Sequence, residues 1–261
     1  MNADIILDID GLVKTYPNGH RAVNGLSFRV LRGSVFGFIG LNGAGKTTTI
    51  RIVAGLAGAD EGTIRLFGKD IAARDDDTKR RMGFVLDEPL YFDWMTAPAY
   101  LHFMGTIYGL DPKTTADRTD ELLQFFDLQG CTGDPIETFS TGMKKKLSLA
   151  AAVIHTPALV VLDEPLEGID ALASRAIKDT LLLMAERGTT VFLTSHVLDT
   201  IERLCTEVAI VDQGRVVLQC RTDEIRTRAK VALPHETYDS LEELFVETVA
   251  GAKTRRGLSF L

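Results

Sequence analysis

The first part of the chain alternates apolar and polar positions in the way that is typical of β-strands. Residues 4–16 show this alternation, and residues 22–30 show it again after the turn Pro17-Asn-Gly19. The apolar run Val35–Ile39 then predicts a further strand. We therefore expect a small antiparallel β-layer ahead of that strand.

A helical spacing replaces the alternation in the middle of the chain. From residue 94 to about residue 137, apolar side chains recur every three or four positions, which predicts two helices in an inserted subdomain spanning about 94–157. The polar stretch 70–81 before it is expected to be a loop. The cluster Tyr91-Phe92-Asp93-Trp94-Met95 has two interpretations: part of the core, or a groove for the helix of another protein.

Strands and helices alternate in the second half. Such alternation implies a parallel sheet with right-handed crossovers, so the predicted fold class is α/β. We expect one domain over 1–220 and a C-terminal extension over 221–261 that contains a short amphipathic helix at 241–246. The predicted helices are 143–154, 171–187 and 197–204, and the predicted strands are 159–162, 190–194, 207–211 and 215–219.

Composition narrows the possible partners. A net charge of −7 in 261 residues argues against non-specific binding to nucleic acid. No secretory signal is visible, and no apolar run approaches the roughly 20 residues that a membrane-spanning helix needs. A cytoplasmic protein without a nucleic-acid partner is expected. The charged run Lys144-Lys145-Lys146 is interpreted as a solvated helix face, and Lys253–Arg256 as a solvated basic tail.

One glycine-rich stretch carries a specific chemical prediction. Gly40–Thr47 fits G-x-x-x-x-G-K-[ST], the phosphate-binding loop, and it lies between a predicted strand and a predicted helix. Its backbone N–H groups and the positive end of the helix dipole would bind phosphate, Lys46 would bridge the β- and γ-phosphates, and Thr47 would ligate Mg²⁺. The expected ligands are ATP and Mg²⁺. The expected nucleotide-binding residues of the loop are Asn42, Gly43, Ala44, Gly45, Lys46, Thr47 and Thr48.

Two carboxylates follow a fully apolar strand. Asp163 and Glu164 come directly after Leu159–Leu162, where burial of charge is costly unless a cation or donors lie nearby. In a protein with a phosphate-binding loop, the first acid holds Mg²⁺ and the second orients and deprotonates the attacking water. These are the roles expected for Asp163 and Glu164.

Together these motifs make the sequence, from about residue 5 to residue 220, resemble the nucleotide-binding subunit of an ATP-binding cassette (ABC) transporter. Phe139–Met143 is similar to the family signature L-S-G-G-Q, although it departs at three of five positions. Its Gly-Met ending resembles the branch that serves drug, antibiotic or lipid exporters. The resemblance implies a P-loop NTPase fold and a homodimer, in which Ser140, Thr141 and Gly142 of one copy close over the ATP bound by the other.

The resemblance implies roles for four further residues. Asp170 matches the loop that reaches across the dimer, His196 matches the switch histidine at the γ-phosphate, and Tyr16 matches the aromatic residue that stacks on adenine. Asp87 stands where the family has a glutamine. It could ligate Mg²⁺ or add unwanted charge beside Asp163 and Glu164, and a shifted register would place Glu88 there instead.

The expected function is therefore that of an ATPase subunit that powers solute movement, with export as the expected direction, through separate membrane permease subunits. The chain would lie on the inner face of the cell membrane through that partner. The expected catalytic residues are Lys46, Glu164 and His196, and the expected metal ligands are Thr47, Asp163 and Asp87. Two alternatives stay open: a soluble ATPase of the same fold, such as one in iron–sulfur cluster assembly, and a nucleotide-binding module without catalysis.

Overall fold

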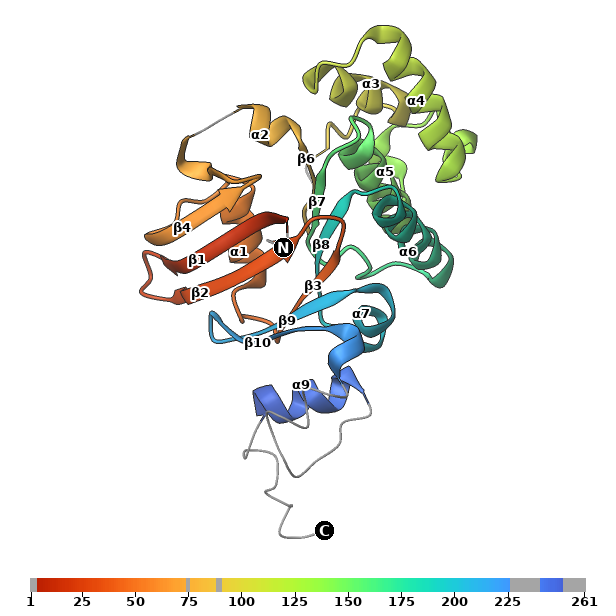
Figure 1. The fold of residues 1–261 in the computed structure, drawn as a ribbon. Helices are drawn as coiled ribbons and strands as arrows, with labels where there is room; N and C mark the ends of the chain where they lie inside the picture. The colour runs from red at the N-terminus through yellow and green to blue at the C-terminus, as the bar shows by residue number, and fades with distance from the viewer. Residues whose placement is uncertain (1–3, 74–75, 88–90, 226–239, 251–261) are drawn as a thin grey trace.

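The structure is a computed structural model that describes residues 4–73, 76–87, 91–225 and 240–250. An antiparallel sheet, a larger mixed sheet and a group of helices at one end make up the molecule (Figure 1). The predicted α/β fold, with a parallel sheet, a flanking antiparallel layer and an inserted helical part, is confirmed.

The antiparallel sheet has four strands in the order β2-β1-β4-β5. Its long central pair is β1 (Ile5–Thr15) and β2 (Arg21–Leu31), which the alternation of the sequence predicts. β4 (Glu61–Leu66) and the two-residue β5 (Lys69–Asp70) complete it. The buried positions of these strands face the larger sheet, since Phe28 of β2 stacks on Phe36 and Phe192 of that sheet.

The larger sheet has six strands in the order β10-β9-β3-β8-β7-β6. β3 pairs in parallel with β8 and β9, and β7 pairs in parallel with β8 and β6. Only the edge strand β10 runs antiparallel, as the hairpin partner of β9. Because parallel strands end at the same edge, the segments that follow β3, β7 and β8 lie together. The bounds are β3 Val35–Ile39, β6 Met82–Val85, β7 Leu159–Leu162, β8 Thr190–Ser195, β9 Glu207–Asp212 and β10 Arg215–Arg221.

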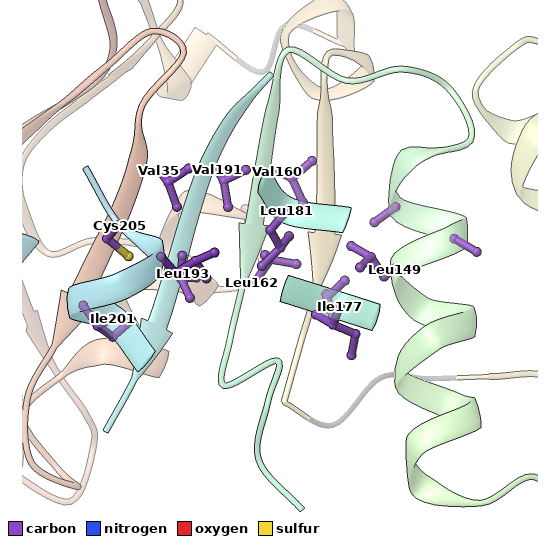
Figure 2. Close-up of a cluster of buried hydrophobic side chains, with 14 of the residues drawn as sticks. Val35, Leu149, Val160, Leu162, Ile177, Leu181, Val191, Leu193, Ile201 and Cys205 are labelled. Atoms are coloured by element: carbon purple, nitrogen blue, oxygen red, sulfur yellow. The ribbon is translucent and has the colours of Figure 1, made fainter. Parts of the chain in front are cut away.

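Two apolar clusters cover the two faces of this sheet, because alternate residues of each strand point to opposite faces. One cluster packs under the helices: Figure 2 shows Val35, Val160, Leu162, Val191 and Leu193 of the strands beside residues of α5, α6 and α7. The other contains Phe36, Phe38 and Phe192 and faces α1 and the antiparallel sheet. The bounds of these helices are α1 Lys46–Val53, α5 Thr141–Val153, α6 Ala171–Glu186 and α7 Leu198–Leu204.

The expected loop over 70–81 is wrong in part. After β5, a 3₁₀ turn (Ile71–Ala73) and the short helix α2 (Asp76–Arg80) occupy this stretch. Acidic residues in the first turn of α2 and basic residues in its last turn match the helix dipole, which favours a helix even without an apolar face.

The helical subdomain consists of α3 (Ala97–Ile107) and α4 (Pro112–Phe125), as the apolar spacing predicts. The aromatic cluster before α3 is divided between interior and surface. Tyr91 donates its hydroxyl to the carbonyl of Lys144 at 2.6 Å, so it belongs to the core. Phe92 and Trp94 are exposed, Trp94 by 74%, and the core interpretation is therefore wrong for these two.

Near the C-terminus, the helix expected at 241–246 is present as α9 (Leu241–Ala250), which packs on α7. The backbone N–H of Leu241 donates to Glu202 Oε2 at 2.9 Å. The boundaries at 220 and at about 94–157 stay predictions, and the basic tail 253–256 lies outside the described residues. Among the described residues, no helix combines the length and the apolar character needed to cross a membrane.

Candidate functional site

The glycine-rich loop joins β3 to α1, and its close contacts require glycine at two positions. Gly45 has φ +103°, and a Cβ there would lie 2.4 Å from the carbonyl oxygen of Ala22. A Cβ on Gly40 would lie 2.4 Å from the carbonyl oxygen of Val211. The loop can therefore curl tightly only because these two positions carry no side chains. A tightly curled loop that leads into α1 leaves the backbone N–H groups at the start of this helix free to bind an anion.

A cleft of about 430 Å³ opens over this loop, a size typical of small-molecule sites. Tyr16 lies at its wall, and the Tyr16 hydroxyl is 3.2 Å from Thr48 Oγ1. Ala44, a predicted nucleotide-binding residue of the loop, is buried in the apolar core and does not line the cleft. The lining residues are Tyr16, His20, Ala22, Asn42, Gly43, Gly45, Lys46, Thr47, Thr48, Asp87, Glu164 and Glu167.

Lys46 and Glu164 form a buried ion pair at the floor of the cleft. Lys46 Nζ donates to the carbonyl of Gly40 at 2.8 Å and lies 3.5 Å from Glu164 Oε1. The other carboxylate oxygen, Glu164 Oε2, is 3.1 Å from Nδ1 of His196. The three predicted catalytic residues are thus in contact. A carboxylate held in this way can accept a proton from water beside a bound phosphate.

Thr194, on the neighbouring strand β8, holds the two acids at the end of β7. Its hydroxyl donates to Asp163 Oδ1 at 2.6 Å and accepts the backbone N–H of Glu164 at 2.9 Å. Glu164 has φ +46°, a conformation that residues other than glycine rarely adopt. Residues other than glycine that adopt such a backbone conformation are concentrated at functional sites. The sequence alone does not indicate a role for Thr194, because its contacts depend on the order of the strands.

The oxygen ligands needed for Mg²⁺ are present at this end of the sheet. Thr47 and Asp87 line the cleft, and Asp163 lies at the end of β7. Hydroxyl and carboxylate oxygens are the ligands that Mg²⁺ prefers, so the donor set fits this ion. Glu88, the alternative to Asp87, lies outside the described residues. Glu164, Glu167 and His196 also bring ligand atoms within 4.8 Å of one another.

The three lysines of α5 do not form one solvated face. Lys145 is 8% exposed, and its ammonium group donates to the carbonyls of Glu164 and Glu167 at 2.8 Å and 2.6 Å. The interpretation as a solvated face is therefore wrong for Lys145. The helical repeat explains the difference, since Lys145 lies one turn from the buried Leu149 on the same face of α5.

Ser140, Thr141, Gly142 and Asp170 do not line the cleft of their own chain. Ser140 caps α5 by accepting the Met143 N–H at 3.2 Å, and Asp170 Oδ1 caps α6 by accepting the N–H groups of Leu172 and Ala173. The backbone N–H of Ala173 holds the pKa of Asp170 below its usual value. A Cβ on Gly142 would lie 3.4 Å from Asp170 Oδ2, so the two caps adjoin.

Comparisons with known proteins give a consistent result. The sequence model of the ABC transporter family matches residues 23–167. The chain is similar to the daunorubicin/doxorubicin resistance ATP-binding protein of Streptomyces peucetius, at 37% identity over 85% of this chain and 67% of that protein. It is also similar to a Nod factor export ATP-binding protein of Ralstonia nicotianae, at 36% identity over 85% of this chain and 69% of that protein. A solved ATP-binding subunit of an ABC transporter superimposes with a TM-score of 0.83 and 31% identity, over 93% of this chain and 99% of that one.

Proposed function

Because the chain belongs to the ABC transporter family and is an ATP-hydrolysing subunit of a transporter, we propose that it powers export through separate membrane permease subunits. The exported molecule would be a drug-like, antibiotic or lipid-like compound, since the relatives are named for drug resistance and for export. A transport role is favoured over a soluble ATPase of the same fold by these relatives.

Hydrolysis is assigned to the residues around the ion pair of the cleft. Glu164 accepts the proton of the attacking water, and His196 orients its carboxylate through the 3.1 Å contact. Lys46 binds the β- and γ-phosphates, and Tyr16 stacks on the adenine. Thr47, Asp163 and Asp87 would hold Mg²⁺, which neutralises phosphate charge when bound. The position of Glu164 between Lys46 and His196 is the observation that carries this proposal.

The second half of each site would come from another copy of the chain. Ser140 and Gly142 lie at the N-terminus of α5 but outside the cleft of their own chain, so they are available to a phosphate held elsewhere. Leu172, beside the cap of Asp170, is 82% exposed, and Leu41 of the glycine-rich loop is exposed as well. Exposed leucines at the start of α6 and in the glycine-rich loop fit a face that a second copy covers.

The permease would dock on the helical subdomain. Phe92, Trp94 and Phe103 form an exposed aromatic group, in which Phe92 and Phe103 meet edge to face with centroids 5.3 Å apart. Such a group fits the apolar face of a partner helix. Through this contact, the chain would lie on the inner face of the membrane.

The test is the variant Glu164→Gln, which keeps the size of the side chain and removes the base. Steady-state ATP turnover should fall about 10²–10⁴-fold, which is the typical contribution of a positioned base, while ATP binding is retained. Glu121→Gln, an exposed glutamate of α4 outside the cleft, is the control and should turn over ATP as the unmodified protein does. Near-normal turnover by Glu164→Gln would overturn the assignment.

A further inference from the structure

Lys145 is a buried cation to which the proposed reaction gives no role. It projects from α5, whose N-terminus carries Ser140, and its ammonium group reaches the loop that follows β7. There it donates to two backbone carbonyls of one chain segment, those of Glu164 and Glu167. An ammonium group in a buried position must have such partners, because burial without them is costly.

Lys145 binds the backbone of Glu164, a residue of the site with a rare backbone conformation. The peptide groups on both sides of Glu164 are held: its N–H donates to Thr194, and its carbonyl accepts from Lys145 at 2.8 Å. Between these two anchors the backbone has φ +46°. The direction in which the Glu164 side chain leaves the backbone, toward Lys46 and His196, depends on that conformation.

We propose that Lys145 is a positioning residue for hydrolysis, which fixes the backbone of Glu164 and thereby aims its carboxylate at the attacking water. The proposal rests on the proposed role of Glu164 as the base. Helix α5 would then serve two ATP molecules. Its N-terminal Ser140 faces the ATP of the partner copy, and its Lys145 binds the catalytic loop of its own chain.

The charges around the lysine support this role. Burial lowers the pKa of the Lys145 ammonium, and the carboxylates of Asp87, Glu167, Glu164 and Asp163 oppose that change. Among these carboxylates, Asp87 has the largest effect. The negative charge of Asp87 therefore helps to keep Lys145 in the protonated form, with which it donates to the carbonyls of Glu164 and Glu167.

The experiment measures kcat and KM for ATP in Lys145→Met, which keeps the length of the side chain and removes its donors. We expect kcat to fall about 10- to 100-fold, as a small misplacement of a reacting group does, with KM changed by less than about twofold. Mg²⁺·ATP should still produce the dimer. Lys178→Met is the matched control and should behave as the unmodified protein. Lys178 is half-buried, and its ammonium group donates to Thr200, which does not line the cleft.

Two further variants separate positioning from a general structural role. Lys145→Arg restores donors to the two carbonyls and should recover most of the lost kcat. The double variant Lys145→Met/Glu164→Gln should be no slower than Glu164→Gln alone, because residues that act as one unit are not additive. If Lys145→Met does not fold, Lys145→Gln takes its place; because it keeps one N–H donor group, we expect a smaller loss of kcat than for Lys145→Met, again with little change in KM.

Several results would overturn the proposal. They are a kcat of Lys145→Met within about threefold of the unmodified protein, a loss of ATP-dependent dimers together with a raised KM, additive losses in the double variant, and failure of both Lys145→Met and Lys145→Gln to fold. Normal turnover by Glu164→Gln alone would instead refute the proposed base.

Discussion

Replacing Thr194 by valine tests how the site is held together, because valine has the same shape and lacks the hydroxyl. Thr194 is completely buried. Among the described residues, its hydroxyl makes the only side-chain hydrogen bonds that connect Asp163 and Glu164 to β8. The variant leaves the Asp163 carboxylate without one donor and the Glu164 N–H without its acceptor. Both groups are in the interior, where water cannot replace the lost partner.

The expected cost follows from these two bonds. A hydrogen bond to a charged group contributes about 1.5–3 kcal/mol, and a buried N–H left without an acceptor costs about 1–3 kcal/mol. We therefore expect the free energy of unfolding to fall by roughly 2.5–6 kcal/mol, a large part of the stability of a typical domain. ATP turnover should fall about 100-fold, since both acids lose their fixed orientation.

Thr190→Val is the matched control on the same strand. Thr190 is equally buried, but among the described residues the only hydrogen bond of its hydroxyl is the one that it accepts from the backbone of Gly33, an exposed residue. Its loss should cost about 1 kcal/mol and leave turnover unchanged. Denaturant unfolding followed by circular dichroism and a steady-state ATPase assay measure both quantities. Equal losses of stability in the two variants, or normal turnover in Thr194→Val, would refute this account of the site.

Two other predictions concern the helical subdomain and its junction with the sheet. His155 stacks on Tyr108 with ring centroids 3.5 Å apart, and burial lowers the pKa of His155 to about 4. Because the unfolded chain then binds more protons than the folded one as pH falls from 6.5 to 4, the unfolding free energy should decrease by about 3 kcal/mol over that range. His155→Phe should lack this component in pH-dependent denaturant unfolding, and identical pH profiles for the two proteins would contradict the assignment. Trp94→Ala should leave the ATPase activity of the isolated chain unchanged and should reduce the amount of membrane protein that co-purifies with it in mild detergent. Phe125, another exposed aromatic residue of the subdomain, supplies the control, and Phe125→Ala should not reduce that amount. Undiminished co-purification by Trp94→Ala would exclude the docking surface.

The parts of the site that the sequence predicts are those encoded within one short segment. The pattern of Gly40, Gly45 and Lys46 can be recognised in the sequence alone, although the backbone groups that exclude side chains at the two glycines belong to Ala22 and Val211. Asp163 and Glu164 follow an apolar strand without interruption, so their place at a strand end can be predicted. The alternation of β1, the apolar run of β7 and the helical spacing of α4 predict these elements for the same reason.

The missing parts depend on which strands are neighbours. Thr194 meets Asp163 because β8 lies beside β7, and the sequence pattern of β8 alone gives no sign of that contact. Lys145 is in a run of three lysines whose charge suggests solvent. Gly142 and Leu149, three and four positions away, lie on the same face of α5 and are buried, and their spacing indicates that Lys145 also faces inward.

The central claim is that two copies of the chain complete each other's ATP site, with Lys46 of one copy and Ser140 of the other at the same phosphate. The most direct measurement is the solution mass of Glu164→Gln, by light scattering or sedimentation, with and without saturating Mg²⁺·ATP. We expect a mass of 28.6 kDa without nucleotide and twice that value with it, and a Ser140→Ala substitution in the same variant should weaken the dimer. A mass that stays at 28.6 kDa under saturating Mg²⁺·ATP would contradict the claim.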